Sequence, residues 1–356
     1  MAFPTHPDNF FEHFRVGQVL EHATPRTVTA GDTALYTALY GTRFALHSSD
    51  DFARSLGLPQ APLDDLLVFN LVFGKTVADI SLNAIANLGY AAGRFGQPVY
   101  CGDTLRTVST VTGLRQNKEG QTGVVYVHSR GLNQRGELVL EYNRWVMVRK
   151  RDATAPAPHP VVPELPSTVP ATDLAIPAGL HSRGYDTTLA GSPHLWEDYQ
   201  PGERIDHVDA MTVEEADHML ATRLYQNPAR VHFNQHAERG GRFGRRLVYG
   251  GHIISLARAL SFNGLANALR VAAIHGGRHV GPTFAGDTIY AWSEVLDKTP
   301  LPAAPDFGAL RIRTVAAKDR PCADFPYQVA EGTYEPAIVL DFDYTVLMPR
   351  RESRGA

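Results

Sequence analysis

The sequence has few cysteines and no long apolar run. Its two cysteines, Cys101 and Cys322, are too few for a disulfide framework, which favours a reducing compartment. No stretch approaches the roughly 18 consecutive apolar residues of a membrane-spanning helix. Residues 1–14 lack the basic, apolar and small-residue order of a secretory signal. We therefore expect a cytoplasmic protein without a membrane partner.

The sequence also lacks an excess of charge of either sign. Lysine and arginine number 34 and aspartate and glutamate 37, a formal net charge of −3, and no like-charge run stands out. A nucleic-acid partner is therefore not expected. No His, Cys and Asp cluster has the spacing of metal ligands, and no glycine-rich phosphate loop occurs. The sequence predicts no metal site.

A proline- and alanine-rich segment, 151–179, divides the chain and is predicted to be an extended linker. The sequences on its two sides match at an offset of 185, as between His47 and His232. Ten positions correspond at this offset, nine of them with the same residue and one with a similar aromatic: Phe14, Gly17, His22, Thr27, Val28, Asp32, Leu35, Leu39, Tyr40 and His47 correspond to Tyr199, Gly202, His207, Thr212, Val213, Asp217, Leu220, Leu224, Tyr225 and His232. We predict a duplicated domain, with copies at 1–150 and 180–356.

Each copy shows the same order of predicted elements. A short helix begins at a capping box, Thr29 to Asp32 in the first copy and Thr212 to Glu215 in the second. A loop with a histidine follows, and then a long apolar helix. Strands with alternating β-branched and aromatic residues come last. The helices are expected within 62–80 and 247–269, and the strands at 104–114, 122–131, 138–148, 288–296, 309–317 and 338–348. This order predicts an α+β fold in which an antiparallel sheet wraps around a central helix.

Two motifs carry a resemblance to a known family. "PVYCGDT" (98–104) and "PTFAGDT" (282–288) match a strand entry, and His47 and His232 match a motif histidine, of the MaoC-like (R)-specific enoyl-CoA hydratases. The likeness covers nearly the whole chain and is most specific to hydratases of C5 dicarboxylic acyl-CoA thioesters.

The resemblance implies a tandem (double) hot-dog fold, with antiparallel sheets each wrapped around a long central helix. It also implies reversible addition of water to mesaconyl-CoA, giving β-methylmalyl-CoA. The implied partner is the CoA thioester of a C5 dicarboxylic acid, and no cofactor is expected beyond the coenzyme A of the substrate. Pairing into a homodimer or a larger homo-oligomer is compatible with this picture.

The sequence departs from the family motif at one catalytic position. The motif aspartate lies five residues before the histidine, where this chain has Thr42 and Asn227. We expect His232 to transfer protons and Asn227 to hold the water, because hydration needs both tasks. His47 is its counterpart in the first copy, which we interpret chiefly as binding the acyl chain.

The remaining site predictions concern substrate contacts. Backbone N–H groups at Gly250 and Gly251 could face the thioester oxygen, although this glycine pair could equally ease helix packing. The first copy has no glycine there, which favours the second as the reacting one. A free carboxylate suits an arginine, either Arg230 or its rival Arg43. The other predicted substrate contacts are Asn234 and His252.

Two other functions stay open at this point. A hot-dog thioesterase would direct its water at the carbonyl carbon, and the fold alone does not exclude this. A non-catalytic acyl-CoA-binding module would explain the missing aspartates.

Overall fold

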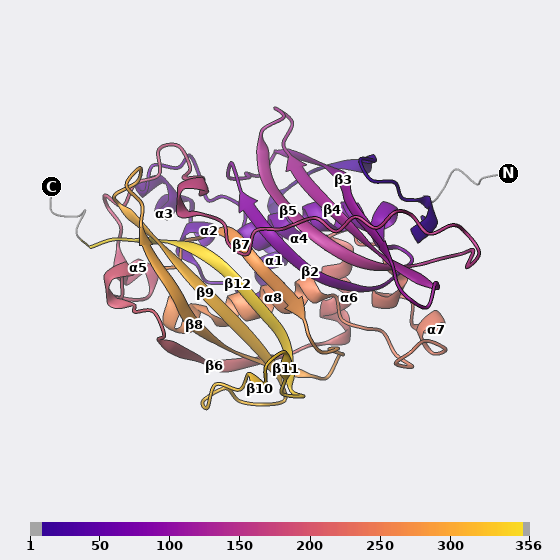
Figure 1. Cartoon of the computed structure of the whole chain (residues 1–356). Helices are drawn as coiled ribbons and strands as arrows, with labels where there is room; N and C mark the ends of the chain where they lie inside the picture. The colour runs from indigo at the N-terminus through magenta and orange to yellow at the C-terminus, as the bar shows by residue number, and fades with distance from the viewer. Residues whose placement is uncertain (1–8, 352–356) are drawn as a thin grey trace.

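One antiparallel sheet of ten strands runs through the whole molecule (Figure 1). The computed structural model describes residues 9–351; residues 1–8, part of the stretch in which no signal sequence is expected, and 352–356 lie outside. Strands of the first copy, in spatial order, are β1 (Val19–Thr27), β3 (Thr104–Gln116), β4 (Thr122–Leu132), β5 (Leu138–Arg149) and β2 (Ala84–Phe95). The second copy continues with β7 (Arg270–His279), β12 (Ile338–Pro349), β9 (Phe307–Lys318), β8 (Thr288–Pro300) and β6 (Arg204–Thr212). A separate hairpin pairs β10 (Gln328–Ala330) with β11 (Thr333–Tyr334).

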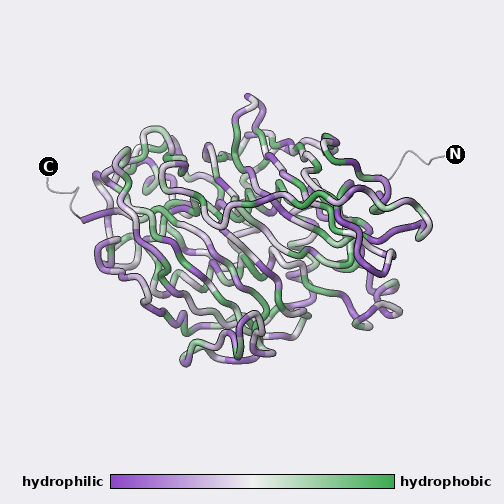
Figure 2. The backbone as a smooth tube through the Cα atoms, in the orientation of Figure 1, coloured by the Kyte–Doolittle hydropathy of each residue, from purple (hydrophilic) through white to green (hydrophobic). Residues whose placement is uncertain are grey.

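The two halves of the sheet join where β2 pairs with β7. All six predicted strands are confirmed, as β3, β4, β5, β8, β9 and β12, whereas β1, β2, β6 and β7 were not predicted. The sequences of β2 and β7 are rich in alanine and glycine, which are weak strand signals. Close packing explains the small residues: Gly277 lies opposite Tyr90, and a Cβ at this glycine would come within 2.9 Å of the Tyr90 ring. Figure 2 shows hydrophobic and hydrophilic residues interspersed along the chain, and buried positions alternate with more exposed ones along most of β3.

The main helices lie together on one face of the sheet, behind it in the view of Figure 1. The two central ones are α4 (Asp65–Thr76), which continues into a π-helical turn (Val77–Ser81), and α8 (Gly250–Leu260). All twelve residues of α4 are buried, which accounts for its predominantly apolar sequence. The other helices are α1 (Ala30–Tyr40), α2 (Ala45–Ser48), α3 (Asp50–Ser55), α5 (Thr187–Ala190), α6 (Glu215–Leu224), α7 (Gln235–Glu238) and α9 (Phe262–Leu265). Both predicted central helices are thus confirmed.

Equivalent residues of the two copies meet or make the same contacts. The amide of Asn70 on α4 donates to the hydroxyl of Ser255 on α8 at 3.1 Å, and these residues are also 185 apart. The Nε2 atoms of His22 and His207 each lie 2.8 Å from a serine hydroxyl on a neighbouring strand. These pairs relate the two copies by an approximate two-fold axis between α4 and α8.

The two predicted capping boxes have different outcomes. Thr29 and Asp32 cap α1 reciprocally, as predicted. The prediction at Thr212 and Glu215 is wrong: α6 begins at Glu215, and its N-cap residue, Glu214, makes no capping hydrogen bond. Thr212 instead ends β6, with its hydroxyl 2.9 Å from that of Thr288. The equivalent of Thr29 at an offset of 185 is Glu214, so the motif match at Thr212 lies two residues too early.

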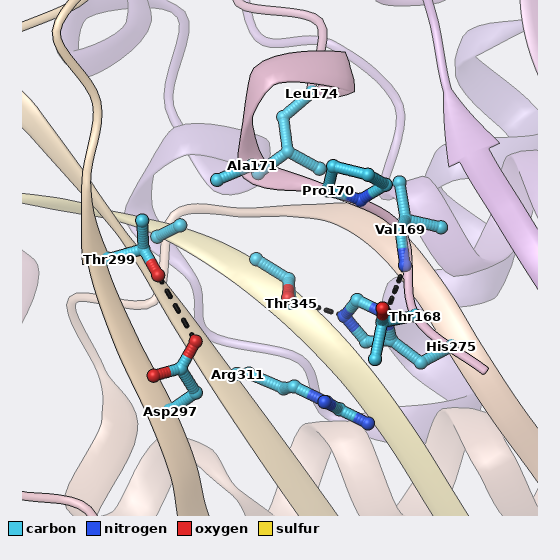
Figure 3. A pocket seen from close by; sticks show the side chains of 11 residues that line it. Thr168, Val169, Pro170, Ala171, Leu174, His275, Asp297, Thr299, Arg311 and Thr345 are labelled. Atoms are coloured by element: carbon cyan, nitrogen blue, oxygen red, sulfur yellow. Dashed lines mark hydrogen bonds between the residues drawn. The ribbon is translucent and has the colours of Figure 1, made fainter. Parts of the chain in front are cut away.

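The proline-rich segment crosses the face of the sheet opposite α4 and α8 (Figure 1). Val161 forms a β-bridge with Leu114, and the N–H of Val169 donates to Nδ1 of His275 on β7 at 2.9 Å. Figure 3 shows the pocket that forms between this segment and the strands, with the His275 ring hydrogen-bonded to Val169 and to the Thr345 hydroxyl. The division at 150 and 180 stays a prediction.

Helices long and apolar enough to span a bilayer do not occur within residues 9–351. The same range contains no group of three His, Cys, Asp or Glu side chains placed to hold a metal ion.

Candidate active site

The two motif histidines occupy equivalent loops and are held in the same way. Nδ1 of His47 lies 3.1 Å from the carbonyl oxygen of Pro62, and Nδ1 of His232 lies 2.8 Å from that of Leu247. Pro62 and Leu247 are themselves 185 apart. Because a carbonyl oxygen only accepts, each Nδ1 carries the hydrogen. A neutral ring then has its lone pair on Nε2, the form that accepts a proton.

In the first copy a buried ionic cluster surrounds the histidine. Nε2 of His47 lies 3.7 Å from Oδ2 of Asp65, the first residue of α4. Asp65 also accepts from the N–H of Val271 at 2.9 Å and lies 3.4 Å from Nε of Arg270. Burial raises the pKa of Asp65, while Arg270 and His47 act to lower it. Asp64 caps the helix by accepting from the N–H of Leu66. The groups around His47 are therefore already paired with one another.

The second copy has no such cluster, because Tyr249 and Gly250 replace the two aspartates. Helix α8 begins at Gly250 without a capping side chain, so N–H groups of its first turn are left without helical acceptors. The ring of Tyr249, the N-cap residue, lies 5.5 Å from that of His232. A Cβ at Gly250 would come within 2.4 Å of the imidazole of His279, so any larger residue here would require that ring to shift. The geometry brings His232 together with an open helix start.

Burial keeps the histidines of this site uncharged. It lowers the pKa of His232 to about 4, although the Leu247 carbonyl acts to raise it. Burial, with a smaller effect of His232, also lowers the pKa of His279 to about 4. Nε2 of His279 lies 3.3 Å from the hydroxyl of Tyr90, whose own pKa burial raises. At neutral pH both imidazoles are bases rather than cations.

The two predicted amide residues form local hydrogen bonds. Asn227 is buried, and its Oδ1 accepts from the N–H of Ala229 at 3.0 Å. Asn234 caps α7 by accepting from the N–H of Ala237. Within residues 9–351 no hydrogen bond joins either amide to His232. Asn227 does line a surface pocket together with Met219, Thr222, Arg223, Gln226, Pro228 and Phe233.

The two predicted arginines lie at the surface. Arg230 is exposed at the start of a 3-10 turn (Arg230–His232). Arg43 is also exposed; its guanidinium stacks 4.4 Å from the ring centre of Phe262 and donates to the side chain of Asn263. The structure therefore does not place either arginine against the partly buried imidazole of His232.

The last two predicted substrate contacts lie between the halves. A Cβ at Gly251 would come within 2.0 Å of Oδ1 of Asn70, so this glycine lets α4 and α8 approach closely. His252 is buried, with Nδ1 3.0 Å from the hydroxyl of Tyr40, and burial lowers its pKa to about 3. The packing interpretation thus accounts for Gly251, and a substrate contact of His252 stays a prediction.

Sequence reasoning missed Tyr249, His279 and Tyr90. Tyr249 could have been identified from the sequence, because it is the equivalent of Asp64, the residue that caps the central helix of the first copy. The other two come from β7 and β2, the central strands that were not predicted.

Known proteins resemble the chain over its full length. Residues 12–131 match the MaoC like domain family. The β-methylmalyl-CoA dehydratase of Chloroflexus aurantiacus is 70% identical, covering 99% of this chain and 100% of that protein. The mesaconyl-CoA hydratase of Cereibacter sphaeroides is 60% identical, covering 97% and 99%.

Solved structures agree with the expected fold. The crystal structure of a MaoC domain protein dehydratase from Chloroflexus aurantiacus superposes with a TM-score of 0.96 at 70% identity, covering 98% of this chain and 100% of the other. A Mycobacterium tuberculosis protein described as a double hot-dog gives a TM-score of 0.74 at 25% identity, covering 96% and 99%. The predicted tandem hot-dog fold is confirmed. The chain belongs to the family of MaoC-like hydratases and dehydratases.

Proposed function

We propose that the protein reversibly adds water to mesaconyl-CoA to give β-methylmalyl-CoA, at a site in its second copy. The observation that carries this placement is the neutral His232 beside the uncapped start of α8. In the first copy, Asp64 and Asp65 occupy the equivalent space. The names of the two relatives with 70% and 60% identity support the substrate.

In the hydration direction, Nε2 of His232 accepts a proton from water while the water oxygen bonds to the β-carbon. Negative charge then develops on the thioester oxygen, and N–H groups at Gly250 and Gly251 stabilise it. The imidazolium returns its proton to the α-carbon, so that one water is added overall. A neutral resting imidazole is required for the first step, and its burial provides that state.

The other predicted residues have supporting roles in this proposal. Asn227 orients the water through its amide, whose Oδ1 keeps a second lone pair beyond its bond to Ala229. His47 belongs to the half that houses the acyl chain, because its Nε2 already faces Asp65. A cytoplasmic setting fits two free cysteines, of which Cys101 is exposed. Further assembly into a homodimer stays a prediction.

The test is to incubate the protein with mesaconyl-CoA, follow the absorbance of the enoyl thioester and measure the product mass, beside His232→Gln and His47→Gln. We expect the gain of one water, lowered about 100-fold or more by His232→Gln and largely kept by His47→Gln. Loss with His47→Gln alone would move the site to the first copy. Release of free CoA would indicate a thioesterase, and binding without turnover would indicate a binding module.

A further inference from the structure

Arg144 on β5 is a buried cation without an acidic partner. It is 1% exposed, and its Nη2 donates to the hydroxyls of Thr76 and Ser81 at 2.9 and 3.4 Å. Its Nε and Nη1 atoms are buried and make no hydrogen bond within residues 9–351. No ion pair of Arg144 occurs in that range. Three of its N–H bonds are thus left without an acceptor, since Nε carries one and Nη1 carries two.

A buried guanidinium with unpaired N–H groups costs free energy unless an acceptor binds to those groups. Removing a guanidinium from water without a counter-charge disfavours its charged form, and burial accordingly lowers the pKa of Arg144. Another buried arginine, Arg258 on α8, avoids this by donating to the hydroxyl of Ser261 and the carbonyl of Ala268. Unpaired donors at Arg144 therefore point to an anionic ligand.

The surroundings connect Arg144 to His232. Its guanidinium lies 4.3 Å from the ring centre of Phe73, and that ring lies 5.7 Å from the ring of Tyr249. Tyr249 in turn contacts His232, and its buried hydroxyl also makes no hydrogen bond within the described residues. Burial raises the pKa of Tyr249 well above its usual value, so this hydroxyl stays a neutral donor. Unpaired donors from both copies thus gather around Phe73.

The proposed substrate requires an anion site near the reacting carbon. In the thioester of an unsaturated four-carbon diacid backbone, the free carboxylate is attached to the β-carbon, where water adds. Its binding group must then belong to the same buried site as the base that activates the water. Arg230 and Arg43 are exposed, whereas Arg144 is buried and separated from His232 by two aromatic rings.

We propose that Arg144 binds the free carboxylate of the acyl group, with the Tyr249 hydroxyl as a second donor. This inference rests on the proposed function and adds the residue that selects dicarboxylic over monocarboxylic substrates. A methyl group in place of the carboxylate would leave the guanidinium buried and unpaired, so such a substrate is rejected. The selecting residue comes from the first copy and the base from the second, so one site needs both.

The test uses two saturated thioesters that cannot be hydrated, succinyl-CoA and butyryl-CoA, which differ in the carboxylate. Binding of each is measured by calorimetry for the wild type and for Arg144→Met. We expect the variant to bind succinyl-CoA about 100-fold more weakly, with butyryl-CoA affinity kept or increased. Arg258→Met is the matched control, since it removes a buried arginine of the same helix–sheet core and should keep the preference for succinyl-CoA.

Two results would overturn the inference: an unchanged preference in Arg144→Met, or equal weakening of both ligands. If Arg144→Met does not fold, Tyr249→Phe removes one hydroxyl only and should lower the preference about 10-fold; an unchanged preference there also overturns it. A wild type that prefers succinyl-CoA through Arg144 but does not hydrate mesaconyl-CoA would refute the proposed function and leave the anion site standing. A protein that hydrates mesaconyl-CoA but has no preference for succinyl-CoA over butyryl-CoA would refute the anion site and leave the proposed function standing.

Discussion

The hydroxyl oxygens of Tyr40 and Tyr225 lie 2.6 Å apart in the interior of the molecule. The two residues are equivalent in the duplicated sequence and both are buried. Tyr40 also lies 3.0 Å from Nδ1 of His252, so the pair continues into the second copy. Burial raises the pKa of both phenols, which keeps them neutral and able to hydrogen-bond. The same side chain from each copy thus meets its counterpart at the approximate two-fold axis.

Removing both of these hydroxyls should cost less than the two single removals added together. We expect Tyr40→Phe and Tyr225→Phe each to lower the free energy of unfolding by about 1–3 kcal/mol, because each leaves a buried hydroxyl without its partner. The double variant should lose clearly less than the sum of the two single losses. Urea denaturation of the four proteins measures this, and additive losses would show that the two hydroxyls do not interact.

A methyl group at the start of α8 should impair the reaction. Gly250→Ala places a Cβ within 2.4 Å of the His279 imidazole, which must shift together with the helix start. We expect kcat/KM for mesaconyl-CoA to fall about 100-fold, as for a displacement of catalytic groups by about 1 Å. Gly31→Ala in α1 is the control, because a Cβ there meets only the Thr29 hydroxyl at 3.4 Å. Equal kinetics of the two variants would contradict the role of Gly250.

The pH dependence of the reaction should follow the partly buried His232. Its neutral form is the base and its pKa is lowered to about 4. We therefore expect kcat/KM to stay level as pH falls from 8 to 5 and to decline only as pH approaches about 4. A decline centred near 6.5 would instead indicate an ordinary, solvated histidine. Circular dichroism should be measured at each pH together with the rate, to show that the protein is still folded.

The free energy of unfolding should also decrease as the pH is lowered from 6.5 to 4. His207, His252 and His279 have pKa values lowered by burial to about 4, 3 and 4. Between pH 6.5 and 4 the unfolded chain binds protons that the folded chain does not, so the free energy of unfolding decreases as pH falls. Each such histidine contributes up to about 1.4 kcal/mol per pH unit. His252→Gln should flatten the slope measured by urea denaturation; an unchanged slope would mean that His252 is protonated in the folded protein.

His275 should help to hold the proline-rich segment against the sheet. This ring accepts from the N–H of Val169 and lies 2.7 Å from the Thr345 hydroxyl (Figure 3). We expect His275→Ala to speed proteolytic cleavage of residues 163–176 several-fold while hydratase activity is kept, because the pocket lies on the face opposite α8. Limited proteolysis followed by mass spectrometry measures this, and unchanged cleavage would show that other contacts hold the segment.

Much of the architecture could be predicted because it repeats. Local patterns identified the central helices and six strands, and the offset of 185 by itself pairs His47 with His232. The Thr212 capping box failed since the motif, read without that offset, matched two residues too early. Strands β2 and β7 were not predicted from the sequence. Their alanine and glycine residues allow close contacts between the copies, and these residue types are weak signals for a strand.

By itself, the sequence determined that two homologous copies are joined in one chain and that each presents a histidine before a long buried helix. Only the tertiary structure decided what those histidines face: Asp65 held by Arg270 in one copy, and an uncapped helix start beside Tyr249 in the other. The same holds for Arg144, which is 88 residues from His232 in sequence and separated from it by two rings in space. The physical reason is that pairing and burial of charge depend on contacts across the sheet and between the copies, which no local pattern encodes.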